Sequence, residues 1–215
     1  MIGCHQAGER LPRHRHVHGY VAVVLDGGFE EAGDDGRIAA RAGTVVVHGL
    51  YEAHQDRFAA KGARVLNLPA IPGLAPGAGS IADPDAVARL AERDPIAAAD
   101  LVRETYCPGA VHAADWPDLL ADALRTDPGL SLTHWADTMR LDPASVSRGF
   151  ARAYGVSPKR FRLEARTRRA VLALSGWHGS LAVFAADHGF ADQAHFTRAV
   201  TALTGRTPGK VRSIR

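Results

Sequence analysis

The sequence has few cysteines and no long apolar run, and both absences narrow its class. Its two cysteines, Cys4 and Cys107, are too far apart for a zinc motif or a disulfide framework, which is typical of a reducing cytoplasm. No run of eighteen apolar residues is present, and no basic segment followed by an apolar stretch opens the chain. We therefore expect a soluble cytoplasmic protein without a membrane partner, and the alanine, arginine and glycine content suggests a GC-rich bacterial genome.

Acidic residues are scarce in the C-terminal part of the chain. Residues 130–215 hold fourteen Lys or Arg against five Asp or Glu, whereas the first 129 residues hold twelve basic and eighteen acidic residues. A basic segment joined to an acidic one indicates a polyanion-binding module fused to a second domain. A chance distribution of solvated charges is the alternative interpretation.

The local patterns change along the chain from strand-like to helical. From about Leu11 to Pro69 the sequence reads as short Val-rich strands bounded by Gly and Asp-Gly. Residues 69–84 are dense in Pro and Gly, which predicts a loop or domain boundary. The predicted helices, with Asp-Pro or Trp-Pro start signals, lie at about 84–94, 95–106 and 116–126. Beyond residue 129 the chain reads as helical to its end.

Two helices in this C-terminal part share one layout, about 48 residues apart. In the first, Asp142 is a good N-cap before Pro143, and Val146 and Phe150 form an apolar stripe. The second lies within "HGFADQAHFTRAVTALTGRTP", which contains no Glu or Lys and offers Gln, His, Thr and Arg instead. These side chains can hydrogen-bond to base edges and phosphates, so we interpret the two segments as helix-turn-helix motifs.

The segment between these motifs predicts a long basic helix. It is capped at Ser157, starts at Pro158 and ends at Gly176, and an unbroken helix of about 18 residues spans about 27 Å. Successive major-groove faces on one side of B-DNA lie about 34 Å apart. The rod can therefore hold two recognition helices in adjacent grooves. Its arginines contact phosphate or pair within the domain, and for Arg166 and Arg169 we favour acidic partners within the domain.

The C-terminal residues also resemble a known family. "FRLEARTRRAVLALSG" followed by "SLAVFAADHGFADQAHFTRAVTALTGRTPGKVR" is similar to the DNA-binding domain of AraC/XylS-type transcriptional regulators, with an Arg-rich linker helix, Gly-Phe, Phe-x-Arg and Gly-x-Thr-Pro in order. The resemblance extends from residue 131 to the end. It implies a sequence-specific regulator that binds double-stranded DNA and is not an enzyme.

This resemblance assigns DNA contacts residue by residue, and the residue types suit direct readout because Arg pairs with guanine and Gln with adenine. The implied contacts are Ala144, Ser147 and Arg148 toward bases and Ser145 and Arg152 toward phosphate in the first motif, and Gln193, His195 and Arg198 toward bases with Asp192 and Thr197 as caps or phosphate ligands in the second.

Histidines are concentrated near the N-terminus. "LPRHRHVHGYVAVVLDGG", followed later by "GTVVVHGLYEAHQDRF", resembles a cupin, a small β-barrel with an H-x-H segment and a later histidine. The Glu that metal-binding cupins carry three or four residues after the pair is missing here. The implied ligands are His14 and His16, or His16 and His18, together with His54, and His48 is the candidate substitute for the missing Glu.

The histidines leave three functions open. Strand alternation places His14, His16 and His18 on one face, and neutral imidazoles ligate zinc, iron, nickel or copper, so a divalent transition metal is a candidate cofactor. A polar pocket without metal is the alternative, which we favour. The chain is then a regulator controlled by a small-molecule effector, a metal-responsive regulator or a cupin metalloenzyme. The missing Glu and the unexplained basic half argue against the enzyme.

The predicted fold is α+β, with a short cupin-like β-barrel (1–70), a loop and helical linker or dimerisation region (71–128) and an all-α domain of two helix-turn-helix motifs joined by a long helix (129–215). Six or seven strands are fewer than a full cupin has. We therefore expect an open or truncated barrel, completed by the following helices or by a second subunit. The apolar residues predicted to form a homodimer surface are Leu90, Ile96, Leu101, Val102, Leu119, Leu120 and Leu124. RNA polymerase is a further expected partner if the protein activates transcription.

Overall fold

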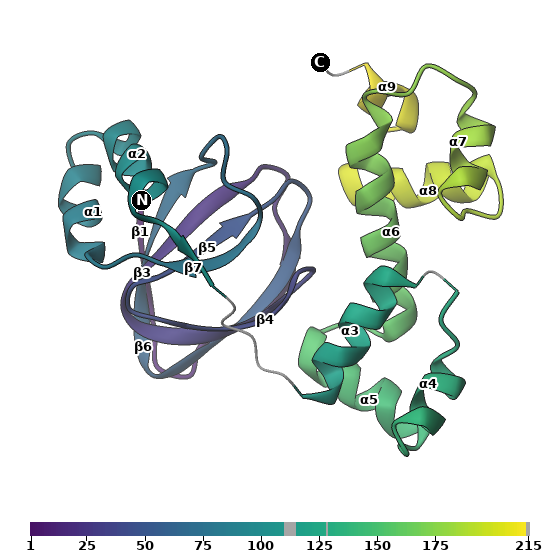
Figure 1. Ribbon diagram of the computed structural model, residues 1–215, viewed down its shortest axis with the longest axis horizontal. Helices are drawn as coiled ribbons and strands as arrows, with labels where there is room; N and C mark the ends of the chain where they lie inside the picture. Colours follow the sequence, from purple (N-terminus) through teal and green to yellow (C-terminus); the bar gives the residue numbers. More distant parts are fainter. Residues whose placement is uncertain (110–114, 128, 214–215) are drawn as a thin grey trace. The chain divides into compact units, whose positions relative to one another are not determined.

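The computed structural model describes residues 1–109, 115–127 and 129–213. The chain divides into two compact units, Met1–Asp118 and Leu119–Arg215, which we name the sheet unit and the helical unit (Figure 1). An antiparallel β-sheet region is followed by a helical domain, so the predicted α+β class is confirmed. The three predicted segments do not coincide with these two units, and the predicted boundary at residue 128 lies outside the described residues.

The sheet unit contains one sheet whose described strands all pair antiparallel. In chain order the strands are β1 (Ile2–His5), β2 (Arg10–Arg15), β3 (Tyr20–Gly33), β4 (Gly36–Arg41), β5 (Thr44–His48), β6 (Ala53–Pro69), β7 (Gly77–Ser80) and β8 (Cys107–Pro108).

Nine helices lie in the described part of the chain. They are α1 (Pro84–Ala91), α2 (Pro95–Thr105), α3 (Trp116–Thr126), α4 (Leu132–Thr138), α5 (Pro143–Tyr154), α6 (Pro158–Leu174), α7 (Leu181–Asp187), α8 (Gln193–Thr204) and α9 (Pro208–Arg212).

Strands β3 and β6 form the centre of the sheet. The first half of β3 lies between β5 and β6, and its second half lies between β4 and β6. Strand β6 also pairs with β1 and β2. The long β3–β6 pairing places residues from the two ends of the segment 31–56 side by side, including Glu31 opposite Asp56.

Both faces of the central strands are buried, which explains the continuous apolar run near residue 20. Val21 and Val23 on one face pack with Val87 of α1 and Val102 of α2. Ala22 and its alternating neighbours on the other face belong to a second cluster. Helices α1 and α2 therefore cover one side of the sheet, while the opposite side forms the interior of the β fold.

The Pro- and Gly-rich segment 69–84, predicted to be a loop or a domain boundary, contains a strand. Strand β7 pairs with β5 on one side and β8 on the other. An added Cβ on Gly79 would lie 2.4 Å from the carbonyl oxygen of Cys107 and 2.5 Å from the Tyr106 ring. A side chain does not fit at this position, so glycine here permits close strand approach and does not mark a turn.

Most of the predicted dimer surface is buried within the chain. Val102, Leu120 and Leu124 are fully buried, and two others, Leu90 and Leu101, are partly buried against the first apolar cluster of the sheet unit. Their periodic spacing therefore reports intrachain packing. Ile96 and Leu119 are exposed. In the described residues, no helix combines the length and apolar character needed to cross a bilayer.

Gly62 has a close backbone neighbour that predicts a strong effect on stability. Its φ is +69°, and an added Cβ would lie 2.2 Å from the carbonyl oxygen of His5. Gly8 has nearly the same φ, +70°, but open space around the Cβ position. We expect Gly62→Ala to lower the free energy of unfolding of the sheet unit by more than about 2 kcal/mol, and Gly8→Ala to lower it by about 1 kcal/mol. Urea unfolding measures both values, and equal losses would contradict the steric explanation.

Candidate functional site

Helix α5 presents most of the first set of predicted DNA contacts to solvent. Its N-cap is Asp142, whose carboxylate accepts a hydrogen bond from the backbone N–H of Ser145 at 2.7 Å. Gly155, with a φ of 72°, ends the helix in the left-handed conformation. Burial of the apolar stripe turns the polar side outward. Of the predicted contacts, Ala144, Ser145, Arg148 and Arg152 are exposed and Ser147 is partly buried.

Helix α8 repeats this arrangement. Asp192 is its N-cap and accepts from the backbone N–H of His195 at 2.6 Å, so the capping role proposed for Asp192 is the one that the structure has. Gly205 ends the helix with a φ of 71°. Gln193 and Arg198 are exposed, whereas His195 and Thr197 are partly buried. The side chain of Arg148 on α5 donates to Ser145, and that of Arg198 projects from an exposed position on α8.

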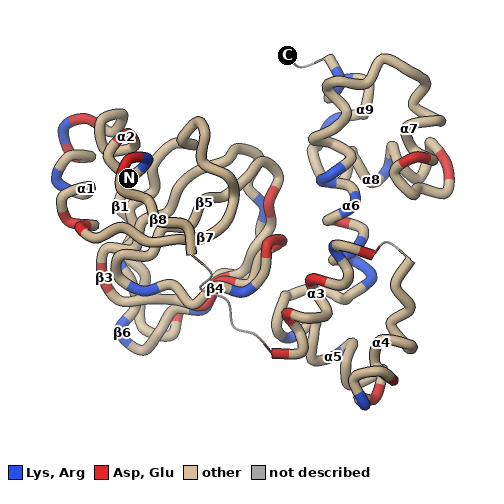
Figure 2. The backbone as a smooth tube through the Cα atoms, viewed as in Figure 1, with Lys and Arg blue, Asp and Glu red and all other residues tan. Residues whose placement is uncertain are grey.

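Helix α6 connects these two motifs as one unbroken helix of 17 residues. Ser157 caps it by accepting from the backbone N–H of Arg160, and Pro158 is its first residue, as the sequence predicted. At about 1.5 Å per residue its length is about 25 Å. Lys and Arg residues recur along α6 (Figure 2).

The two arginines for which acidic partners were expected bind carbonyl groups instead. Arg166 donates to the backbone carbonyl of Gly189 at 2.5 Å and lies over the Phe190 ring, 4.6 Å from its centroid. Arg169 donates to the backbone carbonyl of Arg125. Acidic residues are scarce in this unit, and backbone carbonyl groups near the ends of α3 and α7 take their place. The two side chains tie α6 to both halves of the helical unit.

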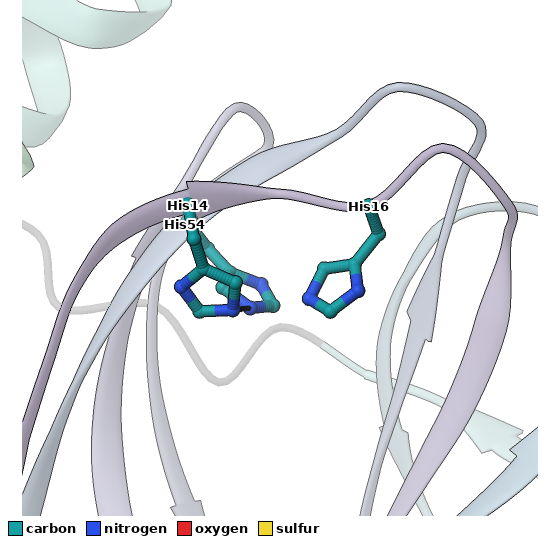
Figure 3. Close-up of side chains that lie close together, drawn as sticks. All are labelled: His14, His16 and His54. Atoms are coloured by element: carbon teal, nitrogen blue, oxygen red, sulfur yellow. Dashed lines mark hydrogen bonds between the residues drawn. The ribbon is translucent and has the colours of Figure 1, made fainter.

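In the sheet unit, three of the predicted metal ligands converge. His14 and His54 are opposite each other on β2 and β6, and their Nε2 atoms are 3.0 Å apart. The ring of His16, just after β2, lies 4.9 Å from that of His14 and 5.1 Å from that of His54 between centroids (Figure 3). One nitrogen of each ring lies within 4.8 Å of the other two. We name His14, His16, Glu31, His48 and His54 the histidine cluster.

Sequence reasoning missed the carboxylate of this cluster. Glu31 on β3 is buried, and its Oε1 lies 3.5 Å from His54 Nδ1 while its Oε2 lies 3.6 Å from His48 Nε2. It is fifteen residues after His16, far from the position that the cupin resemblance implied. The alternation of β3 and its register with β6, which places Glu31 opposite Asp56, is the signal that could have found it.

The two remaining predicted ligands, His48 and His18, differ in burial and in their neighbours. His48 is buried, stacks on Tyr20 with ring centroids 4.3 Å apart, and joins Glu31 and His54 in a second group of three candidate ligands. His18 is exposed and belongs to neither group. Strand β2 ends at Arg15, so the strand alternation that was predicted to place His18 on the same face as His14 does not extend to it. The prediction of one face for all three N-terminal histidines is therefore wrong for His18.

Burial keeps the imidazoles of the cluster neutral. Loss of water, together with the neighbouring imidazoles His54, His14 and His48, lowers the pKa of His16 to about 4. Burial lowers the pKa values of His14, His48 and His54 in the same direction. It raises the pKa of Glu31. Near neutral pH each histidine therefore has a free lone pair to offer.

The family of the helical unit follows from a match that covers most of it. Residues 135–214 match the family described as a helix-turn-helix domain. Residues 135–214 form an AraC-type helix-turn-helix domain. The match includes α5, α6 and α8. No curated protein matches the sequence.

Solved structures give weaker similarities. The C-terminal domain of AraT, a response regulator from Geobacillus stearothermophilus, is 19% identical, with 47% of this chain and 87% of that chain covered at a TM-score of 0.43. Fatty-acid-bound ToxT from Vibrio cholerae is 9% identical over 98% and 93% of the two chains, with a TM-score of 0.40. KdgF from Halomonas sp. is 18% identical over 31% and 61%, with a TM-score of 0.29. The assignment of the AraC-type domain therefore rests on the family match.

Three histidines of the cluster fit a metal ion in chemistry and in orientation. His14 Nδ1 lies 3.0 Å from the carbonyl oxygen of Pro12, so a proton on Nδ1 donates there and leaves Nε2 as the free ligand atom. In His54, Nδ1 faces Glu31 and Nε2 faces His14. Two nitrogens on one tetrahedral zinc are about 3.3 Å apart, close to the observed Nε2 separation. Such histidine–carboxylate pairs are typical of the groups behind metal ligands.

The sheet unit also contains a pocket that is large enough for a small molecule. It has a volume of about 1030 Å³. Phe29 and Phe58 line it together with several alanines. Its charged lining residues are four cations and two carboxylates, so positive charge is in excess: Arg10, Arg41, Arg57, Lys61, Asp26 and Glu30. An apolar wall with a few charged groups is the usual composition of a ligand pocket.

The cap of α6 predicts a measurable contribution to stability. Ser157→Ala removes the acceptor for the Arg160 backbone N–H, and we expect it to lower the free energy of unfolding by about 1 kcal/mol. Ser157→Asp retains an acceptor and is the matched control, for which we expect stability close to that of the original chain. Urea unfolding followed by helical circular dichroism measures both. Equal stability of the alanine variant and the original chain would contradict the capping role.

Proposed function

We propose that this protein is a sequence-specific DNA-binding transcriptional regulator whose sheet unit binds an effector. The observation that carries the proposal is the repeated arrangement of α5 and α8 on a single connecting helix, with Arg148 and Arg198 exposed. The positive charge of the AraC-type domain supports it, because phosphate neutralisation supplies most of the affinity of such proteins for DNA.

The proposed base contacts use the exposed ends of both recognition helices. Arg148 and Arg198 would pair with guanine, and Gln193 with adenine. Ser145 and Arg152, and Thr197 with its partial exposure, would contact phosphates, while Ala144 and Ser147 would lie against base edges or methyl groups. Asp142 and Asp192 act indirectly, because they fix the first turn of each helix.

Substitution of the two arginines tests this function. We expect Arg148→Ala and Arg198→Ala each to weaken binding to a duplex selected from a random pool by about 1–3 kcal/mol, and to relax sequence preference at one position each. Arg93→Ala, at an exposed arginine after α1, is the matched control and should bind as the original chain does. Fluorescence anisotropy over a range of salt concentrations measures the affinities. Unchanged affinity in both recognition-helix variants would contradict the assignment.

The nature of the effector has two candidates. The pocket lined by Phe29 and Phe58 supports a small molecule with an apolar body and a negatively charged group, which Arg10 or Arg57 would attract. Footprinting of a selected duplex with and without candidate effectors of this class tests control of DNA binding. We propose a regulatory and not a catalytic role, because a catalytic cupin would not account for the basic AraC-type domain.

A metal-responsive regulator is the second candidate, and the convergence of His14, His16 and His54 favours it. These three side chains would hold a divalent transition metal, with Glu31 behind His54 as the orienting group. A bound ion would supply positive charge and cross-link β2 to β6. The carboxylate that the cupin resemblance implied is missing from its expected position, but Glu31 supplies one from another strand.

Metal analysis after substitution separates the two candidates. We expect the chain, incubated with Zn²⁺ and dialysed, to retain one ion, and His16→Ala or His54→Ala to abolish retention because each removes one of three ligands. His18→Ala is the matched control, since this exposed histidine lies outside the cluster, and it should retain the ion. Equal loss in all three variants, or no retention by the original chain, would contradict the metal-responsive function.

A further inference from the structure

A small basic pocket lies on α6 in the helical unit. Its volume is about 410 Å³. The pocket is lined by Leu132, Pro158, Lys159, Arg162, Leu163, Arg166 and His195. Leu132 begins α4 of the first motif and His195 belongs to α8 of the second, so the pocket lies between the two helix-turn-helix motifs.

The charge around this pocket is of one sign. Lys159, Arg162 and Arg166 contribute cations, and no Asp or Glu is among the described residues that line it. Glu164, the acidic residue of α6, is buried and accepts from Arg160 Nε at 2.6 Å. An anion would therefore meet three positive charges and no carboxylate in the pocket.

Arg166 is held in place before any ligand arrives. Its Nη1 donates to Gly189, its guanidinium lies over Phe190, and its buried Nε has no hydrogen-bond partner among the described residues. Burial lowers its pKa, and repulsion by Arg162 and Arg169 lowers it further. Like charges held this close favour binding of an anion, because the anion relieves their repulsion.

His195 also belongs to this pocket more than to the exposed face. Its ring is partly buried, edge-on to Phe190 with centroids 5.4 Å apart. Gln193 and Arg198 on the same helix are exposed. In a duplex that contacts these two residues and α5, the sugar-phosphate backbone would run past the pocket. The positive end of the α6 dipole, near Lys159, would add to the attraction of the pocket for a phosphate.

From this geometry we propose that the pocket binds one phosphate group of the DNA backbone, in the stretch of duplex between the two recognition helices. The proposal rests on the proposed DNA-binding function and adds a contact to it. The pocket has room for a phosphate and its shell of water. Its role is to fix the register of the duplex, since phosphate contacts position a protein without reading sequence. His195 is then a phosphate contact, in place of the base contact that the resemblance implied.

Substitution of two charged residues that line the pocket, Lys159 and Arg162, tests whether the pocket binds a DNA phosphate. We expect Lys159→Gln combined with Arg162→Gln to weaken binding by the same factor on a selected duplex and on a shuffled one, and to reduce the slope of log affinity against log salt by about 1. Arg64→Gln combined with Arg93→Gln removes two positive charges from exposed positions of the sheet unit and should leave the slope unchanged. Lys159→Gln alone, at an exposed residue, should show the same change in smaller measure.

A backbone scan identifies the phosphate. In duplexes with one neutral methylphosphonate at each position in turn, we expect one position between the two recognition sites to weaken the original chain and to have no further effect on the double variant. If no position behaves in this way, or if the double variant keeps the slope and affinity of the original chain, the pocket does not bind a DNA phosphate.

The outcomes separate this proposal from the function on which it rests. If the original chain binds no duplex in a salt-dependent way, DNA binding itself is refuted, whatever the pocket does. If the original chain binds and the double variant equals it, only the pocket proposal is refuted. If inorganic phosphate raises the melting temperature of the original chain but not of the double variant, while the salt slopes on DNA are equal, the pocket takes a free anion and the assignment to the DNA backbone is overturned.

Discussion

The packing of α6 against both helix-turn-helix motifs is the constraint on which the helical unit depends. Near its start, Phe161 packs edge-on against Phe150 and Tyr154 of α5, with ring centroids 5.3 Å away in each pair. Further along, Arg166 holds Gly189 and Phe190 before α8. The directions of both recognition helices therefore follow from one buried helix face. A shift of α5 would open its aromatic contacts with Phe161 in the core.

In the sheet unit, the two faces of the central strands have different roles. One face of the β3–β6 pair is committed to apolar packing with α1 and α2, which leaves the interior face to hold both an apolar cluster and a polar one. Tyr20 and His48 share a face with Ala22, so the polar group continues an apolar row and does not interrupt it. Buried imidazoles are stable there because neighbouring carboxylates and rings replace water, which also keeps them unprotonated.

Local sequence signals predicted the helical unit well because its helices carry their own start and stop residues. Asp142, Ser157 and Asp192 cap the helices that the sequence placed there, and Gly155 and Gly205 end them. The family resemblance supplied the roles of individual residues, which spacing alone does not give. Contacts between distant residues were harder, as the carbonyl partners of the α6 arginines show.

The sheet unit was predicted in outline only, since its features depend on pairing between strands far apart in sequence. Glu31 reaches the histidines through the register of β3 with β6, and no short motif encodes that register. Gly79 lies in a segment predicted to be a loop or domain boundary from its Pro and Gly content, but a glycine is also required where strands approach closely. The apolar spacing of Leu120 and Leu124 indicated burial correctly, but periodicity does not say whether the covering surface belongs to the same chain.

The continuity of α6 has a consequence for the genome in which the protein acts. A helix without a break has no hinge, so on the proposed function the two recognition elements of a binding site must keep a fixed separation. One inserted base pair would rotate the second element by about 34–36° around the duplex axis and displace it by about 3.4 Å. We therefore expect natural binding sites to differ in the base sequence of each element but to keep the same number of base pairs between the two elements.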